Sequence, residues 1–242
     1  FLRCRQELVE GWQSEVCRSS DNALVVRRIA STMLIYLLAL VRFINTFHGV
    51  TAGQPFGETR MDYEKQYFEY QDIIKAFNTS YKQWLYGANF DISRQYEAYK
   101  CVNFKKDNVS LTELNFTAHY LKGSLSDSTR FYGKLSMDNN GADAKTSELR
   151  KRPNSIEVSS TPGTFSGTHF RLIYSDYKNC SILRVPSEQE GSGCIVLLTI
   201  RSVKTGLPRF CNSTYRNACG TQRKFYKVFD DSCKLTENPA GC

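Results

Sequence analysis

Residues 113–121 read Glu-Leu-Asn-Phe-Thr-Ala-His-Tyr-Leu, the most regular run in the chain. Apolar residues, Leu114 and Phe116 among them, alternate with polar residues, which is the period of a strand with one buried face. Asn115 begins the sequon Asn-Phe-Thr, and a glycan attached there must face water. We therefore predict a strand whose Leu114 side faces the interior.

Six further runs of this kind lie between residues 99 and 200, each bounded by turn residues. They are Tyr99–Lys105, Arg130–Met137, Ser155–Ser159, Thr164–Tyr174, Ser181–Val185 and Cys194–Ile200. A last extended piece covers 224–229. Short strands at such near-regular spacing predict a barrel or a sandwich.

Two helices are expected at the ends of this strand region. Residues 61–78 mix apolar and charged residues without Gly or Pro, which predicts a short amphipathic helix. After Pro208, a second helix would place Phe210, Thr214 and Ala218 on one stripe and end at Gly220. The order helix, antiparallel strands, helix and strand is typical of a lipocalin, an eight-stranded antiparallel barrel that encloses a small ligand.

Composition limits the function classes. The 242 residues carry a net charge of +8, but Lys and Arg are dispersed, and the one dense run, at residues 150–152, precedes Pro153. This pattern argues against a nucleic-acid groove. None of the nine cysteines forms a C-x-x-C pair or stands at zinc-finger spacing to a histidine. We therefore expect disulfides, an oxidising compartment and no metal.

The N-terminal region predicts secretion. Residues 1–32 show no sustained period before the first methionine, Met33, and we interpret them as disordered, translated upstream sequence. Residues 33–52 resemble a signal peptide cleaved after Ala52. The alternative is a membrane anchor, but such an anchor needs ~20 apolar residues, and Arg42 and Asn45 interrupt this run. Residues 53–242 would then form one domain, with the barrel at about 60–235.

Five sequons follow in that domain and support a glycosylated, extracellular protein. They begin at Asn78, Asn108, Asn115, Asn179 and Asn212. Catalytic motifs are missing: His119 and His169 are present, but there is no Gly-x-Ser-x-Gly elbow, His-Glu-x-x-His pair or phosphate-binding loop. We expect no enzyme activity, no catalytic residue and no cofactor.

Four separated pieces of the chain resemble the tick salivary lipocalins, the histamine-binding protein family of blood-feeding ticks. They are Tyr99-Lys-Cys101-Val, Tyr174-Ser-Asp-Tyr-Lys-Asn-Cys180-Ser-Ile-Leu-Arg-Val, the Cys211 to Cys219 helix, and Asp231-Ser-Cys233-Lys-Leu. The resemblance covers nearly all of residues 60–235. It implies a secreted lipocalin that sequesters a small host mediator, such as histamine or serotonin, to evade host defence.

The resemblance also implies the disulfides. Cys101 would bond Cys233, and Cys180 would bond Cys211. Cys194 with Cys219 is a third pair, found in only some members. Cys242 is left over, either as a free thiol or as a competitor for Cys194.

Family members that bind amines use acidic side chains inside the barrel, because a buried ammonium needs a carboxylate partner. Their signature is Cys-Asp-aliphatic and, after a gap, Glu-Leu-aromatic. Here the matching residues are Cys180-Ser-Ile and Ile195-Val-Leu, without either acid, and another amine-site carboxylate aligns with Arg171. These changes favour a fatty acid or a leukotriene as the ligand.

Arg171 has two interpretations. It anchors a ligand carboxylate inside the barrel or, if the register differs by one residue, faces solvent while Phe170, Leu172 and Tyr174 face inward. With Arg171, we expect an aromatic ligand site. Its other members would be Tyr86, Phe90, Phe116, Tyr120, Phe131 and Tyr174.

We expect a monomer that contacts no nucleic acid and, after signal cleavage, no membrane. An alternative function is a protein-binding inhibitor of complement or coagulation that has no small ligand and works through a basic, glycan-bearing surface.

Overall fold

The computed structural model describes residues 57–92, 99–138, 150–164 and 167–233. All of them belong to the unit Gly53–Cys242. The predicted upstream segment, the predicted signal peptide and Cys242 lie outside the described residues. No helix within the described part is both long enough and apolar enough to cross a bilayer.

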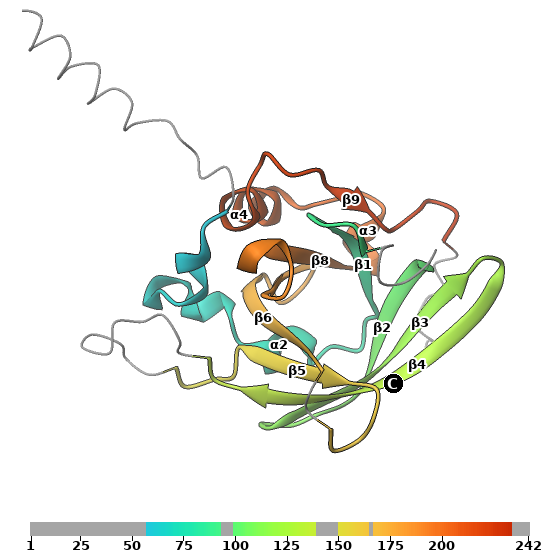
Figure 1. Ribbon diagram of the computed structural model, residues 1–242, viewed down its shortest axis with the longest axis horizontal. Helices are drawn as coiled ribbons and strands as arrows, with labels where there is room; N and C mark the ends of the chain where they lie inside the picture. Colours follow the sequence, from blue (N-terminus) through green and yellow to red (C-terminus); the bar gives the residue numbers. More distant parts are fainter. Residues whose placement is uncertain (1–56, 93–98, 139–149, 165–166, 234–242) are drawn as a thin grey trace, which may run out of the picture. The chain divides into compact units, whose positions relative to one another are not determined.

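Eight antiparallel strands close into a barrel, and Figure 1 shows them arranged in a ring. Each strand pairs with the next, β8 pairs with β1, and β1 pairs with β2 where Gln83 and Trp84 face Phe104 and Asn103. The predicted mainly β, lipocalin-type barrel is therefore confirmed. The strands are β1 (Gln83–Ala88), β2 (Tyr99–Val109), β3 (Glu113–Lys122), β4 (Leu125–Ser136), β5 (Ser155–Ser159), β6 (Thr168–Ser175), β7 (Cys180–Val185) and β8 (Gly193–Thr199).

One barrel strand was missing from the sequence prediction. β1 is apolar on both faces, because Trp84 packs edge-on against Phe229 while Leu85 joins a different cluster, and so it shows no alternation. The extended piece predicted over 224–229 is not a barrel strand. Only β9 (Tyr226–Lys227) pairs there, on the edge of β1 beside Gly87 and Ala88.

The predicted helix over 61–78 is instead three short helices. They are η1 (Thr59–Asp62), η2 (Lys65–Tyr70) and α2 (Ile73–Phe77). The Gln71 amide donates to the carbonyls of Met61 and Ile173, so contacts with the barrel fix the chain between η2 and α2. Asp72 then starts α2 anew by accepting from the Lys75 N–H.

The predicted C-terminal helix is α4 (Arg209–Cys219), and it ends before Gly220, whose φ is 83°. Its buried face differs from the predicted stripe, because Phe210 is 76% exposed while Cys211, Tyr215, Ala218 and Cys219 are buried. The disulfides of Cys211 and Cys219, which bond to cysteines of the barrel strands, hold this face against the barrel. Two shorter helices, α3 (Ile200–Val203) and η4 (Gln189–Gly191), flank β8.

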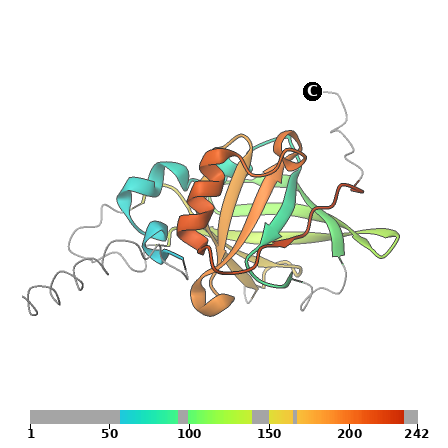
Figure 2. The ribbon, with the colours of Figure 1, turned by 90° about the horizontal axis from the view of Figure 1, so that it is seen from above.

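Three disulfides join Cys101 to Cys233, Cys180 to Cys211, and Cys194 to Cys219. These are the pairs that the family resemblance implied. All six cysteines belong to one buried cluster with Trp84, Ile182, Val196, Tyr215 and Ala218. This outer cluster joins the barrel wall to α4, which lies beside the strands of the wall in Figure 2.

A second buried cluster occupies the inner face of the wall. Its buried members come from seven strands and from α2. They are Leu85, Leu114, Leu135, Ile156, Leu172, Leu183, Leu197, Ile73 and Ala76. Leu114 is 1% exposed, as expected of a residue that faces inward. The inner and outer clusters therefore use alternate residues of the same strands.

Candidate ligand site in the barrel lumen

The inner face of the barrel changes from buried to partly exposed along its axis. At the α2 end, the inner-cluster leucines and Ile156 are at most 7% exposed. Further along the same strands, several inner-face side chains are only partly buried. They are Phe116, Phe131, Val158, Phe170 and Ile195. The inner face is therefore more exposed at the end opposite α2, which we call the barrel mouth.

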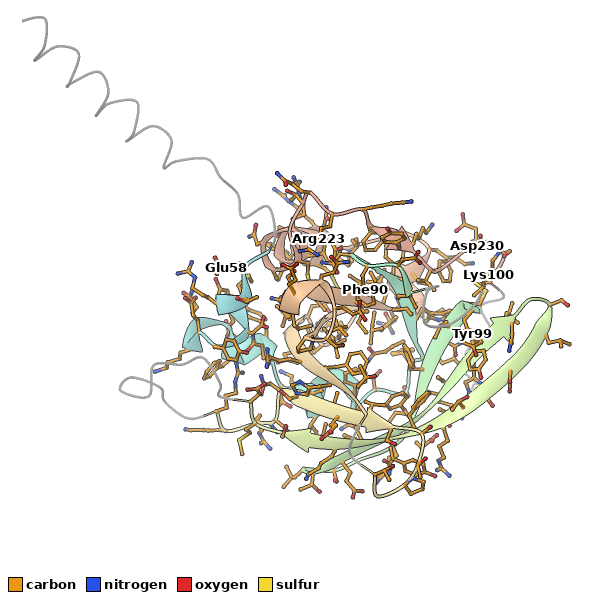
Figure 3. All side chains as sticks on the ribbon, viewed as in Figure 1. Glu58, Phe90, Tyr99, Lys100, Arg223 and Asp230 are labelled. Atoms are coloured by element: carbon orange, nitrogen blue, oxygen red, sulfur yellow. A yellow bond between two sulfur atoms is a disulfide. The ribbon has the colours of Figure 1, made fainter. Side chains whose placement is uncertain are left out.

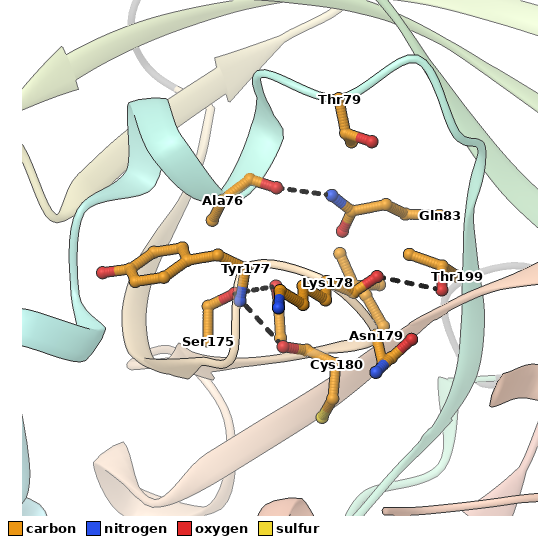
Figure 4. A pocket seen from close by; sticks show the side chains of 11 residues that line it. Ala76, Thr79, Gln83, Ser175, Tyr177, Lys178, Asn179, Cys180 and Thr199 are labelled. Carbon is orange, nitrogen blue, oxygen red and sulfur yellow. Dashed lines mark hydrogen bonds between the residues drawn. The ribbon is translucent and has the colours of Figure 1, made fainter. Parts of the chain in front are cut away.

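The α2 end is closed. Ile73 is fully buried and its N–H donates to the Pro153 carbonyl, while the Gln83 amide donates to the Ala76 carbonyl. Beneath α2 lies a polar cavity of about 10 Å³ (Figure 4). The Ser175 and Ser181 hydroxyls lie 3.0 Å apart on its wall. A cavity of this size holds about one water molecule, so this end has no room for a mediator.

An aromatic row lines the lumen on the opposite wall. Phe104, Phe116 and Phe131 come from the neighbouring strands β2, β3 and β4. The centroids of the first two rings are 5.7 Å apart in an edge-on arrangement, and those of the last two are 5.5 Å apart and stacked. Such a surface suits an apolar or aromatic guest.

Buried carboxylates lie elsewhere. Among the described residues, the buried acids are Asp62 and Asp138, and both bind arginines on the outer side of the wall. On β5, Glu157 stands between the inward-facing Ile156 and Val158, so it belongs to the outer face. The described lumen therefore presents apolar side chains without a buried acid.

Arg171 takes part in a buried charge cluster on the outer face. Its Nε lies 2.9 Å from an oxygen of Asp138, and its Nη1 lies 3.2 Å from one of Asp62. Arg184, opposite Arg171 on β7, is fully buried and makes two contacts of 2.8 and 3.0 Å with Asp62. It also donates to the Ala218 carbonyl of α4.

The electrostatics of this cluster are set by burial and by the paired acids. Burial alone lowers the pKa of Arg171, but the hydrogen bond and charge of Asp138 outweigh it and hold that pKa above its ordinary value. Burial lowers the pKa of Arg150, which lies over the Phe68 ring, to about 10. The guanidinium of Arg171 therefore forms its ion pairs with Asp138 and Asp62 of the chain itself. Phe170 and Leu172 face the lumen, whereas Arg171 is 7% exposed beneath η1 and does not face solvent.

The structure brings together only some of the predicted aromatic residues. Phe116 and Phe131 stack in the lumen, and Phe90, labelled in Figure 3, packs with Val185 near Phe170 at the mouth. Tyr120 lies further along β3. Its ring is 4.5 Å from that of Tyr99, and its hydroxyl is 2.9 Å from that of Thr129.

The other two predicted aromatic residues lie with the outer cluster. Tyr86 packs against Phe225 at 5.8 Å, and Tyr174 packs against Tyr70 at 5.4 Å. Sequence reasoning left four lumen residues out of the predicted site: Phe104, Val158, Phe170 and Ile195. Three of these stand two positions from a buried inner-face residue of the same strand, so strand alternation would have found them.

Residues 61–235 match the family model described as tick histamine binding protein. No curated protein matches the chain. Among solved structures, the AM182 serotonin complex has a TM-score of 0.49 and 14% identity, over 67% of this chain and 92% of that one. Japanin from Rhipicephalus appendiculatus, bound to cholesterol, has a TM-score of 0.44 and 13% identity, over 65% of this chain and 98% of that one.

Lobster apocrustacyanin A1 has a TM-score of 0.44 and 14% identity, over 73% of this chain and 88% of that one. The family model covers most of the chain and includes every strand of the barrel. This protein therefore belongs to the tick histamine-binding protein family.

Proposed function

We propose that this protein is a secreted salivary carrier that holds the acyl chain of one small lipid mediator, such as a fatty acid or a leukotriene, in its lumen. Membership of the family supports small-ligand binding at the family level. The single observation that carries the ligand class is the inner face, which is apolar and, in the described residues, free of a buried acid.

An amine is the less favoured guest for a physical reason. A buried ammonium loses its hydration and needs a carboxylate to compensate. Asp62 and Asp138 each bind arginine and lie on the far side of the wall from Leu172 and Leu183. The acyl chain of a fatty acid carries no charge into the same space and gains from covering the partly exposed rings of Phe116 and Phe170, while its carboxylate stays hydrated at the mouth.

The proposed mode of action is stoichiometric. Removal of a mediator by mass action requires protein in excess over ligand and a Kd below the working concentration of the mediator. Release into host tissue, where the mediator acts, follows from the proposed secretion. The three disulfides are consistent with an oxidising compartment. We place N-glycans first at the exposed sequon residues Asn78, Asn108 and Asn212.

The test is calorimetric titration of the purified protein with histamine, serotonin, arachidonate, a leukotriene and cholesterol. We expect one-to-one binding of arachidonate or the leukotriene and no heat with either amine. Binding of an amine alone would refute the apolar ligand class. If none of the five compounds produced binding heat, the result would favour the alternative function, a protein-binding inhibitor of complement or coagulation.

A matched pair of variants tests whether the binding measured by calorimetry takes place in the lumen. Phe116→Ala removes a ring of the aromatic row, while Phe210→Ala removes a ring that is 76% exposed on α4. Only the first change should weaken binding, by about tenfold, which corresponds to ~1.4 kcal/mol. Equal affinities of the two variants would place the ligand outside the lumen.

A further inference from the structure

β4 extends beyond its partner on one side. It pairs with β3 from Leu125 to Lys134. β5 pairs only with Tyr132–Ser136. Within the described residues, no strand pairs with Leu125–Phe131 on the β5 side. The hairpin of β3 and β4 projects from the rest of the barrel in Figures 1 and 2.

The chain after β5 turns away from this edge. The Ser159 hydroxyl accepts from the Thr161 N–H and lies 3.0 Å from the Thr164 hydroxyl, while the Thr164 hydroxyl donates to the Thr161 carbonyl. These bonds close a compact turn over 159–164, so β5 does not continue along β4. The edge of β4 is therefore left open by the local structure of its neighbour.

The hydrogen bonds of β4 show which residues face the open side. Leu135 donates its N–H to Thr112, on the β3 side, while the carbonyl of Ser136 accepts from Asn154, on the β5 side. Alternate residues of an antiparallel strand bond to the same neighbour. The backbone groups of Ser126, Ser128 and Arg130 therefore point to the open edge. In agreement, the Ser128 N–H donates to the carboxylate of Asp127, 2.7 Å away, and not to β3.

We propose that this edge, Leu125–Phe131, docks on the same edge of a second copy of the chain. The two strands would run antiparallel around a two-fold axis at Ser128, with about six backbone hydrogen bonds from the three outward-facing positions of each copy. A symmetric contact of this kind closes at two copies and does not propagate. The resulting dimer differs from the monomer expected from the sequence.

The side chains are self-complementary in this register. Leu125, which is 74% exposed, faces the partner's Phe131, and Asp127 faces the partner's Thr129. Arg130, held by Asp107 at 3.3 Å, faces the partner's Ser126. Opposite positions therefore combine apolar with apolar and charged with hydroxyl groups, and no like charges face each other directly.

Asp127 limits the strength of this contact. Its carboxylate holds the Ser128 N–H that the central pair requires, and the two copies of Asp127 lie diagonally across the axis, where their charges repel. Charged residues on open edges are a common protection against pairing. The dimer of the unmodified protein is therefore weak, and removal of this one acid strengthens it.

The test is analytical ultracentrifugation of the secreted full-length protein across a range of concentrations. We expect a weak, concentration-dependent dimer, and Asp127→Ser should tighten the dimer at least about tenfold. In the Asp127→Ser background, Ser128→Pro should abolish the dimer because proline has no N–H, whereas Ser128→Ala should leave it intact. Thermal melts of each variant would show that the barrel is folded. A monomeric Asp127→Ser protein at every concentration, or a dimer that Ser128→Pro does not weaken, would overturn the proposal.

Discussion

Neighbouring residues of β6 and β7 meet opposite environments on the two faces of one wall. Leu172 and Leu183 join the inner apolar cluster, while Arg171 and Arg184, one position away, bind Asp62 on the outer side. The two arginines lie where η1 supplies a carboxylate, Asp62, and α4 supplies a carbonyl, that of Ala218. The inner face is left apolar and partly open. The comparison teaches that buried charges fasten the outer elements to the wall, while the apolar inner face combines a packed end with the partly exposed end that we propose as the ligand site.

The strongest way to break the outer face is Asp62→Asn. Asp62 is fully buried and bonds both Arg171 and Arg184, so the change leaves the buried guanidinium of Arg184 without its carboxylate and leaves Arg171 with Asp138 alone. We expect a loss of ~3–5 kcal/mol in the free energy of unfolding, measured by urea denaturation. The exposed Asp231→Asn is the matched control, with an expected change within about 0.5 kcal/mol. Equal midpoints for the two variants would contradict the structural role of the cluster.

Removal of the disulfide between Cys101 and Cys233 is expected to come next. This bond links residues 132 positions apart and lies in the outer cluster. Cys101→Ala or Cys233→Ala should cost ~2–5 kcal/mol and reduce secretion of folded protein. The yield of protein secreted into the culture medium and the melting temperature of the purified protein measure the effect. A variant with normal values for both would show that the bond is dispensable.

Two substitutions on β3 sharpen the comparison within the inner face. Leu114 is 1% exposed and Phe116 is partly exposed. Leu114→Ala should cost ~2–5 kcal/mol of stability because it leaves a cavity in a packed site. Phe116→Ala should lose less stability and more ligand affinity. Urea denaturation and titration of the same samples measure both quantities, and a reversed order would mean that the guest lies at the α2 end.

Arg171→Gln distinguishes the two faces directly. The change breaks the contacts with Asp138 and Asp62, so we expect a loss of ~1–3 kcal/mol of stability. Affinity for arachidonate should stay the same, since Arg171 is on the outer face. Calorimetry and thermal melts of one preparation give both answers. If the affinity for arachidonate fell tenfold while the melting temperature stayed unchanged, the result would show that Arg171 binds the ligand.

The smallest expected effect is on the pH dependence of stability. Burial lowers the pKa of His169 and of His119 in the folded protein. The unfolded chain therefore binds protons more readily, from its ordinary histidine pKa of about 6.5 downward, and stability falls as the pH drops below that value. His169→Gln should reduce the fall in melting temperature between about pH 7 and pH 5. An identical slope in the variant would show that His169 does not contribute.

The alternation of apolar and polar residues predicted the strands that have one buried and one exposed face. It failed for elements whose structure is determined by contacts with residues far away in the sequence. β3 and β5 were found because apolar and polar residues alternate along them. β1 was missed because Trp84 and Leu85 are buried on opposite faces. The helix predicted over 61–78 is broken because Gln71 bonds Ile173, a residue 102 positions away. No local pattern contains that partner.

The ligand site was predictable to the same extent. Phe116 and Phe131 follow from alternation and aromatic character. Tyr174 lies with the outer cluster because a bulge between Leu172 and Tyr174 changes the phase of β6. The partners of Arg171 lie 33 and 109 positions away, so the sequence shows a cation without its carboxylates.

The most direct measurement is the set of nuclear Overhauser contacts between bound arachidonate and the side chains of the folded protein. The apolar lumen predicts contacts from the acyl chain to Phe116, Phe131, Val158, Phe170 and Ile195, and none to Arg171 or Arg184. Contacts confined to the outer cluster, or a bound carboxylate beside Arg171, would contradict the assignment of the lumen as the ligand site.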